Sequence, residues 1–372
     1  MSQFFVRTAS AADNESLCEL SRVPNAGQIS LALERYPDFF AGAQVQNEAV
    51  EINLCCDRAG GDRIAAVFST GRRNLFLNNE ACWVRYLSDV RILPEYHGRR
   101  PLRMINDHII ERERSQPSPA IQSVMFSDND AMRGAIRRRP PEVLRRWKYL
   151  WFYKLGTYRT SAVSLTTSAR RHRCCHSIRR ATLDDVAAMQ SFFDKEAPAK
   201  QLYPNYRFGR LTEPYYQGQS IGDYFLAFDG AELVGITGVW DQQGFKQTRV
   251  VRYGGALRWC RPLFNLHSRT ATGFSLPVPG TILAYFYLHT IVVKGNSADI
   301  FRDLVERIHA EYRGRDYLYF VCGLFSHDPL VRVIDSFKSR RDIMGQHYQA
   351  GADELTDPLA PEQPMYVEAA RI

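Results

Sequence analysis

The sequence predicts a mixed α/β (α+β) protein built from two units, and three observations support this fold class. The chain has 372 residues, which is about 2.5 times the length of a typical domain. Hydrophobic residues make up 45% of the chain and charged residues 24%, values that indicate a globular protein and exclude a disordered tail or a coiled coil. In each half, several stretches with strand character follow one another without a helix between them. This order favours mixed, mostly antiparallel sheets flanked by helices over one doubly wound sheet.

The first half opens with a short strand and continues with helices and a series of strands. Residues 49–56 alternate apolar and polar side chains, as expected of a strand with one buried face. Leu102, Ile105 and Ile109 recur at helical spacing and mark the buried face of a helix. The predicted order is strand 4–8, helices 12–21 and 28–35, strands 49–56, 63–69 and 82–93, helix 100–113, strand 121–126, helix 130–138 and strand 149–158.

The second half repeats this order of elements with different residues. Thr182 and Asp185 form a capping box at the start of its first helix. Asn296 caps a later helix, in which Ile300 and Leu304 belong to one apolar stripe. The predicted order is strand 177–180, helix 182–195, strands 224–228 and 233–240, a long strand ending near residue 293, the helix after residue 296, strand 317–324, helix 329–337 and a closing strand over 365–370.

A segment without apolar periodicity separates the two halves. Residues 161–177 combine small polar side chains with a basic cluster, as a linker does. The sequence therefore predicts an N-terminal domain over residues 1–162, a linker over 163–176 and a C-terminal domain over 177–372.

The cysteines and the longest uncharged stretch indicate a cytoplasmic protein. Eight cysteines stand at irregular positions, including two adjacent pairs, which is not the framework of a small secreted scaffold. The stretch between Arg269 and Lys294 has no charged residue but contains Pro277, Pro279 and Gly280. A loop followed by a buried strand fits this stretch better than a membrane span does. We therefore expect no membrane partner.

The net charge of +8 favours anionic partners but is spread along the chain. The basic run Arg137–Arg139 stands near aromatic residues, yet a solvated face explains it better than a nucleic-acid site does. Residues 172–176 gather two histidines and two cysteines, but adjacent cysteines do not easily occupy two corners of one tetrahedral site. Neither nucleic acid nor a metal is an expected partner.

The most informative stretch is 86–104, where an apolar strand enters a charged turn and leaves into an amphipathic helix. The first turn of a helix presents N–H groups without intrahelical partners and the positive end of the helix dipole, and so forms a seat for phosphate. Arg99 and Arg100 add two positive charges there. A solvated connection is the alternative for such a junction.

The run Val90–Arg99, VRILPEYHGR, resembles the acetyl-coenzyme A signature of the GNAT N-acetyltransferases. In that family a strand ends in a sequence such as V-L-P-E-Y and is followed by R-G-x-G-x-G. The resemblance covers residues 3–160 and implies a degenerate second copy over 177–372. It therefore implies two tandem GNAT-like domains and an acyl-coenzyme A cosubstrate. In the second copy only Gly295 remains of such a signature, so no coenzyme is expected there.

Carried over by position, the resemblance implies that backbone groups of Ile92 and Leu93 face the pantetheine arm. It also implies that Asn129 contacts this arm. Two bulky side chains replace the family's glycines, and Pro101 between them suits the first position of a helix. The turn residues implied to hold the pyrophosphate are His97, Gly98, Arg99, Arg100 and Leu102.

Acyl transfer to an amine requires a proton acceptor, a polarised carbonyl and a proton for the leaving thiolate. Asp89 and Glu51 are the candidate bases, because a partly buried carboxylate has a raised pKa. The family's usual acid is a tyrosine, and its position falls on Ala135 here. The sequence thus predicts an N-acyltransferase that moves an acyl group, acetyl or related, from coenzyme A to a small-molecule or peptide amine. A non-catalytic binding or sensor module and a basic nucleic-acid-binding protein are the alternatives.

Overall fold

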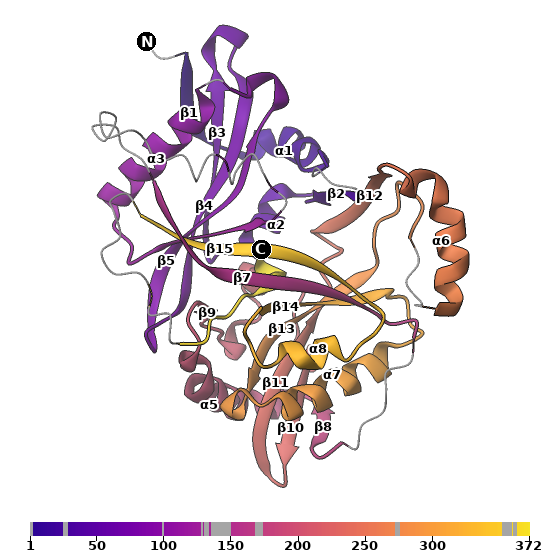
Figure 1. Ribbon diagram of the computed structural model, residues 1–372. Coiled ribbons are helices and arrows are strands. Elements are labelled where there is room, and N and C mark those ends of the chain that lie inside the picture. Colours follow the sequence, from indigo (N-terminus) through magenta and orange to yellow (C-terminus); the bar gives the residue numbers. More distant parts are fainter. Residues whose placement is uncertain are drawn as a thin grey trace.

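The computed structural model describes residues 3–24, 29–98, 100–127, 129, 134, 150–167, 174–271, 276–351, 359 and 363–372. Its strands form one large mixed sheet that runs through the whole molecule, with helices on both faces (Figure 1). A separate two-stranded sheet lies beside it. The sheet therefore joins the two halves of the chain.

The elements have the following bounds along the chain. The strands are β1 (Phe4–Thr8), β2 (Ile29–Glu34), β3 (Ala49–Asp57), β4 (Arg63–Leu77), β5 (Glu80–Ile92), β6 (Ile121–Phe126), β7 (Trp151–Ser164), β8 (Ser177–Arg180), β9 (Tyr203–Pro204), β10 (Tyr224–Asp229), β11 (Glu232–Trp240), β12 (Gln247–Tyr253), β13 (Tyr285–Val293), β14 (Tyr319–Phe325) and β15 (Arg340–Gly351). The α-helices are α1 (Asn14–Ser21), α2 (Phe39–Gln44), α3 (Pro101–Ser115), α5 (Val186–Glu196), α6 (Leu257–Ala271), α7 (Ala298–Tyr312) and α8 (Val331–Asp335). Short 3-10 turns connect them, among them Pro94–Tyr96, Lys294–Asn296 and Ala369–Arg371.

The last strand of each half is inserted into the sheet of the other half. The order of the large sheet is β1-β3-β4-β5-β6-β15-β7-β14-β13-β11-β10-β8. β15 pairs with β6 and β7 pairs with β14, while β15 and β7 run antiparallel to each other along most of their length. Each half thus completes the sheet of the other, and the two halves interlock through β7 and β15.

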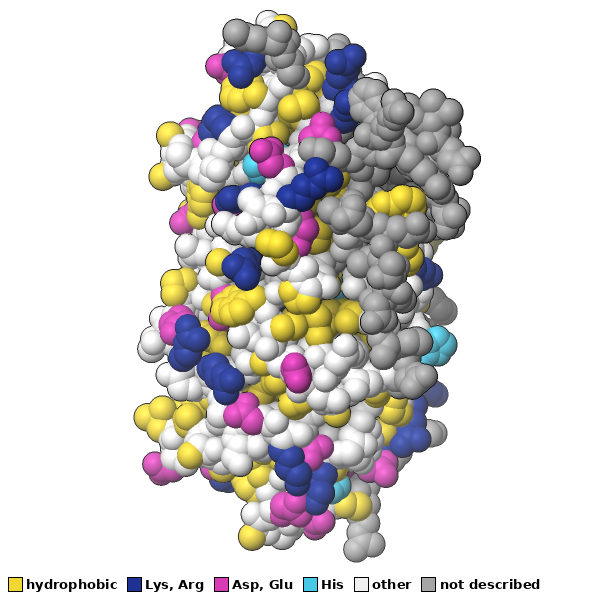
Figure 2. All heavy atoms as spheres, turned by 90° about the vertical axis from the view of Figure 1, so that its left-hand side faces the viewer, with side chains coloured by type: hydrophobic (Ala, Val, Ile, Leu, Met, Phe, Trp, Pro, Cys, Tyr) yellow, Lys and Arg dark blue, Asp and Glu magenta, His cyan; other side chains and the backbone are white. Residues whose placement is uncertain are grey.

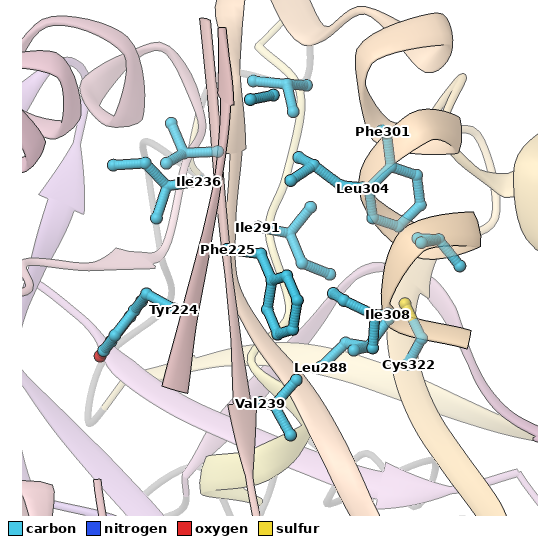
Figure 3. Packing of buried hydrophobic residues seen from close by; sticks show 14 of the residues in the cluster. Tyr224, Phe225, Ile236, Val239, Leu288, Ile291, Phe301, Leu304, Ile308 and Cys322 are labelled. Atoms are coloured by element: carbon cyan, nitrogen blue, oxygen red, sulfur yellow. The ribbon is translucent and has the colours of Figure 1, made fainter. Parts of the chain in front are cut away.

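The cores lie between the sheet and the helices on its two faces. In the C-terminal half, Phe301, Leu304 and Ile308 of α7 point toward Phe225 of the sheet, whereas Tyr224 points to the opposite face (Figure 3). α5 covers that opposite face. In the N-terminal half, α3 packs on one face and the pair α1 and α2 on the other. The buried stripe predicted from residues 300, 304 and 308 is confirmed.

Two predicted elements were wrong. Residues 28–35 were expected to form a helix, but β2 occupies most of this range and pairs with β12, more than two hundred residues away. The burial of Ser30, Ala32 and Glu34 follows strand alternation, and Glu34 is buried because Arg249 of β12 binds its carboxylate. The closing strand is β15 rather than 365–370, where an isolated bridge at Met365 precedes the Ala369–Arg371 turn.

The helix caps and the end of β7 were also predicted from the sequence. The Thr182 N–H donates to the Asp185 carboxylate at 2.8 Å, which confirms the capping box. Ser297, not Asn296, is the N-cap of α7. The expected linker begins later than residue 163, because Val163 and Ser164 still belong to β7, and the domain division itself stays a prediction. The helix expected over 130–138 and the basic run within it lie outside the described residues.

The uncharged stretch before residue 294 contains a buried strand, as expected. β13 begins at Tyr285, and its side chains from Leu288 to Val293 are buried. None of the helices in the described part of the chain has the length and the apolar content needed to cross a bilayer.

Candidate acyl-coenzyme A site

Each half of the sheet contains a pair of parallel strands that separate after three residue pairs. β5 and β6 pair from Arg85 to Leu87, and β13 and β14 pair from Tyr285 to Tyr287. We call the diverging segments the N-terminal fork, formed by 88–92 of β5 and 124–126 of β6, and the C-terminal fork, formed by 288–293 of β13 and 322–325 of β14.

A left-handed residue bends the longer strand of each fork. Asp89 has φ 56° and Thr290 has φ 50°, values that non-glycine residues rarely adopt. Beside each residue the register with the antiparallel neighbour, β4 for Asp89 and β11 for Thr290, shifts as in a β-bulge. The bulge turns the strand away from its parallel neighbour, so that backbone groups past the bulge no longer have a ladder partner on that side.

The C-terminal fork is filled by the chain itself. The Thr290 N–H donates to the Glu368 carboxylate at 3.0 Å, and the Ile291 N–H donates to the Tyr366 hydroxyl at 3.2 Å. A Cβ added to Gly323 of β14 would lie 2.6 Å from the Cβ of Ala369. Residues 366–369 therefore occupy the position beside β13 that a ligand would need.

Arg371 fixes this plug. Its buried guanidinium lies 3.6 Å from the ring centre of Tyr215 and 4.8 Å from that of Trp240. It donates to the carbonyls of Val45 and Tyr215 and to the hydroxyl of Tyr206. Burial raises the pKa of Glu368 above its usual value. The plug is thus a fully buried polar network inside an aromatic cage.

The N-terminal fork has a different polar neighbour, the ion pair of Asp89 with Arg35. Two bonds of 2.9 Å and 2.7 Å join the carboxylate to the guanidinium. Burial acts to raise the pKa of Asp89, but Arg35 and a hydrogen bond from Ser69 outweigh it and hold this pKa below its usual value. The sequence-based expectation of a raised pKa is therefore wrong, because Arg35 could not be placed beside residue 89 from the sequence.

Lys246 is a functional candidate that the sequence reasoning missed. It immediately precedes β12, and the Glu34–Gln247 register pair brings it beside Arg35. Its Nζ donates to the backbone oxygen of Ile372 at 3.0 Å. Burial and the nearby arginines lower the pKa of Lys246 to about 7, although Asp89 acts to raise it. No local pattern marks this lysine, because only the pairing of β2 with β12 brings it to the fork.

Glu51, the second candidate base, lies away from this group. It stands on the face of the sheet that α3 covers, where Arg112 of α3 binds its carboxylate. The Thr70 hydroxyl also donates to it, at 3.4 Å. Asp89 faces Arg35 on the other side of the sheet, so the structure does not bring the two carboxylates together.

The end of β5 has the strand–turn geometry that the resemblance implies, with one difference. The Leu93 N–H donates to the Ala65 carbonyl at 3.0 Å, so this amide is taken by β4 rather than turned toward a ligand. In the alternating antiparallel ladder, the groups of Ile92 then point away from β4. Its carbonyl accepts a 3.0 Å hydrogen bond from Nε2 of His97.

The turn leads directly into α3. Gly98 adopts φ 75°, and a Cβ added to it would have no atom within 4 Å, so the turn is open at this point. Pro101 is the first helical residue, as predicted, and Arg100 is its exposed N-cap. Leu102 is partly exposed at the next position. The bulky side chains thus leave the start of α3 accessible, while Arg99 lies outside the described residues.

The remaining expectations concern β6 and metal ligands. Asn129 is exposed just after β6, and its N–H donates to the Phe126 carbonyl at 3.2 Å. The segment with Ala135 that would follow it lies outside the described residues. Within the described ranges, no three His, Cys, Asp or Glu side chains are grouped as metal ligands would be.

Each half thus contains a fork followed by a helix, and the two halves exchange their last strands. No protein-family model matches the sequence, and no curated protein matches it either. Solved structures do match in three dimensions. A GCN5-related N-acetyltransferase from Sphaerobacter thermophilus matches at 10% identity, covering 100% of this chain and 99% of that one, with a TM-score of 0.56.

Two further solved structures share this fold. The N-myristoyltransferase of Saccharomyces cerevisiae, solved with bound myristoyl-CoA, matches at 9% identity over 99% of this chain and 88% of that one, with a TM-score of 0.60. A GCN5-related N-acetyltransferase from Anabaena variabilis matches at 11% identity over 94% and 73% of the two chains, with a TM-score of 0.53. The chain has the fold of the GCN5-related N-acetyltransferases, which confirms the resemblance read from Val90–Arg99.

Proposed function

We propose that the protein is an N-acyltransferase whose N-terminal fork binds an acyl-coenzyme A. The observation that carries this proposal is the difference between the forks: residues 366–369 occupy the C-terminal one, whereas no described side chain hydrogen-bonds to the backbone amides of 88–92. The pantetheine arm would lie beside β5, where the amide of Ile92 points away from β4. This amide would also polarise the thioester carbonyl.

The start of α3 would hold the pyrophosphate. Gly98 in its left-handed conformation turns the chain into the helix, and the first-turn amides and the helix dipole favour an anion there. Arg100 stands at the N-cap and adds a positive charge. His97, Leu102 and, from the sequence, Arg99 complete the proposed turn, and Asn129 after β6 is proposed to contact the pantetheine.

Lys246 is the proposed base, because the pairing of β2 with β12 places it beside Arg35, which binds Asp89 of the fork. With a pKa of about 7, a large share of its side chains is neutral at physiological pH and can accept a proton. The amine would attack the thioester carbonyl, a C–N bond would form and the C–S bond would break. The proton from the amine would pass to Lys246, and the thiolate would take a proton from solvent.

Asp89 takes a positioning role in this scheme. Because Arg35 keeps it ionised, it is a weak proton acceptor, but its negative charge supports the protonated form of Lys246 and so tunes that pKa. Glu51 is not part of the proposed centre, because it pairs with Arg112 on the other face. In this proposal Lys246 is the base, and the Asp89 carboxylate adjusts the pKa of Lys246 instead of accepting the proton itself.

The acyl donor is proposed to be acetyl-coenzyme A or a longer acyl-coenzyme A, and the acceptor a small-molecule or peptide amine. The structure of the yeast relative holds a myristoyl thioester, which makes longer chains worth testing beside acetyl. All eight cysteines are unpaired, which supports the proposed cytoplasmic location.

Ligand-dependent melting and thiol release test the proposal. Acetyl-, octanoyl- and myristoyl-coenzyme A are each added to the protein, and at least one is expected to raise Tm. At a hundredfold excess over Kd, the bound ligand adds about 2.7 kcal/mol to the free energy of unfolding. Free thiol should then appear when a panel of amines is added. A Tm unchanged by every thioester at millimolar concentration would refute binding at the fork.

A second candidate is a binding or sensor module without catalysis. The replacement of the family's glycines by Arg100 and Leu102, and of its tyrosine by Ala135, favours this reading. It predicts a rise in Tm with no thiol release from any donor and amine pair. The same assays therefore separate the two candidates.

A further inference from the structure

An arm projects from the main sheet and consists of β2, β12, α6 and the segment that returns to β13. We define the arm as residues 29–34, 247–271 and 276–283. α6 lies at its outer edge beside β12 (Figure 1). Its inner face is fixed, because Leu257 and Phe264 pack against β12 and Leu276. Asn265 also accepts from the Leu276 N–H at 2.7 Å and donates to its carbonyl at 2.9 Å.

The outer face of α6 is apolar and exposed. Trp259, Leu263 and Leu266 are 77%, 69% and 67% exposed. At 100° per residue their spacing places them within an arc of about 60°. This arc is opposite the face that packs against β12. α6 therefore has two apolar faces, and the one with Trp259, Leu263 and Leu266 is exposed.

Exposed apolar side chains are concentrated on the arm. Of the thirteen large hydrophobic residues that are exposed in the described part of the chain, seven belong to it. They are Ile29, Leu33, Trp259, Leu263, Leu266, Val278 and Ile282. Scattered single residues need no explanation, but a concentration on one peripheral element indicates an interaction surface.

The exposed charged side chains of the arm are basic, because its one acidic residue, Glu34, is buried and bound by Arg249. No Asp or Glu occurs between Asp241 and Asp299. The basic residues in that interval are Lys246, Arg249, Arg252, Arg258, Arg261, Arg269 and Lys294. Arg252 and Arg258 are exposed. The side of the molecule facing away from α6 differs, because acidic and basic side chains are interspersed over it (Figure 2).

We propose that α6 binds the surface of an anionic membrane, with Trp259, Leu263 and Leu266 inserted at the headgroup level. An amphipathic helix with an apolar Trp/Leu face and neighbouring arginines is suited to lie in this interface. Among the described residues no acidic side chain pairs with Arg252 or Arg258, and anionic lipids would supply the negative charge. A second copy of the chain fits less well, because two such faces would bring like charges together.

This proposal differs from the sequence-based expectation of no membrane partner. That expectation followed from the absence of a suitable span between Arg269 and Lys294. The outer face of α6 lies before that stretch in the chain. In the sequence alone, its apolar residues look like the buried face of an ordinary helix. Only the structure shows that the fold leaves them exposed.

Vesicle co-sedimentation tests the proposal with the full-length protein. Vesicles of phosphatidylcholine alone are compared with vesicles that also contain phosphatidylglycerol, each at low and high salt. The protein is expected to sediment with the anionic vesicles at low salt and to be released as salt rises. The variant with Trp259→Ser, Leu263→Ser and Leu266→Ser should bind at least about tenfold more weakly.

Two further variants keep the result decisive. Arg258→Glu preserves the apolar face and should weaken binding to anionic vesicles severalfold, whereas Leu183→Ser, at an equally exposed leucine (78%) outside the arm, should change nothing. Equal binding by the wild type and the triple variant would overturn the proposal, and so would no binding to either vesicle. A wild-type dimer that the triple variant converts to a monomer, without lipid binding, would assign the surface to a second copy instead.

Discussion

The two forks share a backbone design but differ in what occupies them. Both have a short parallel pairing, a left-handed residue and a helix that begins soon after the longer strand. In the C-terminal fork, Glu368 and Tyr366 take the amides of β13. In the N-terminal fork, the nearby groups are instead the Arg35–Asp89 pair and Lys246. One geometry therefore supports a structural plug in one half and a proposed ligand site in the other.

The same fork geometry can therefore serve either stability or ligand binding. A diverging strand pair leaves amides without ladder partners, and these must be satisfied by the chain, by water or by a ligand. Where the chain satisfies them, the fork contributes to stability. Where a ligand does so, changes in the fork should affect binding and rate more than stability.

The largest expected effect concerns the C-terminal plug. Arg371→Met leaves the carbonyls of Val45 and Tyr215 without their donor and Glu368 buried without a cation nearby. We expect the free energy of unfolding to fall by about 3–5 kcal/mol, measured by urea denaturation.

The control for this change is Arg207→Met, which removes an arginine from an exposed pair with Asp194. It should cost no more than about 1 kcal/mol. A similar, small loss in both variants would show that the plug does not hold the C-terminal half together.

The next effect concerns the proposed base. Lys246→Met should lower kcat/KM by at least about 100-fold, because the proton acceptor is lost. In the wild type, kcat/KM should rise with pH through about 7 as Lys246 loses its proton. The control is Glu51→Gln, which is expected to leave the rate unchanged. A kcat/KM that stays constant from roughly one pH unit below to one pH unit above the pKa of Lys246 would exclude this lysine as the base.

Lys246 also gives a pH-dependent stability with a definite sign. Its pKa is about 7 in the fold and about 10.4 in the unfolded chain. Burial of the ammonium is therefore unfavourable, fully so below pH 7, and this penalty is relieved as pH rises toward the unfolded value. Lys246→Met should raise Tm most in acid and progressively less in alkaline buffer. A Tm gain that grows with pH would contradict this assignment.

A smaller effect is expected at the start of α3. Arg100→Glu places a negative charge at the proposed pyrophosphate seat and should weaken coenzyme A binding by about tenfold, measured by titration calorimetry. Arg114→Glu makes the same charge change at the other end of the helix and should alter the affinity little. Equal losses in the two variants would indicate a general charge effect rather than a site at residues 97–102.

The smallest effect is a shift in the pH profile. Asp89→Asn removes the negative charge that supports protonated Lys246 and leaves Arg35 unneutralised. Both changes lower the pKa of Lys246, so the midpoint of kcat/KM should move to lower pH. Asp194→Asn, which makes the same change in an exposed pair with Arg207, serves as the control. A midpoint that stays in place, or moves up, would remove Asp89 from its positioning role.

Much of the fold was predictable because local patterns carry it. The alternation in β3, the helical stripe of α7 and the capping box at Thr182 specify elements from neighbouring residues alone. β2 was mistaken for a helix because its partner β12 is distant in sequence. The exchange of β7 and β15 was not predicted for the same reason, since non-local pairing leaves no local signal.

The candidate site was predictable only along one strand and turn. The run from Val90 to Arg99 located the strand end, Gly98 and the start of α3. The electrostatic partners, Arg35 and Lys246, come from elsewhere in the chain and invert the pKa expected for Asp89. The plug could not be foreseen either, because Tyr366 and Glu368 resemble an ordinary strand until their contacts with β13 are known.

A crystal structure of the protein with bound coenzyme A tests the central claim most directly. The account predicts the pantetheine beside residues 88–92 of β5 and the pyrophosphate at the start of α3, with residues 366–369 still in place beside β13. Coenzyme A bound at β13 with those residues displaced, or an N-terminal fork blocked by Arg100 and Leu102, would contradict it.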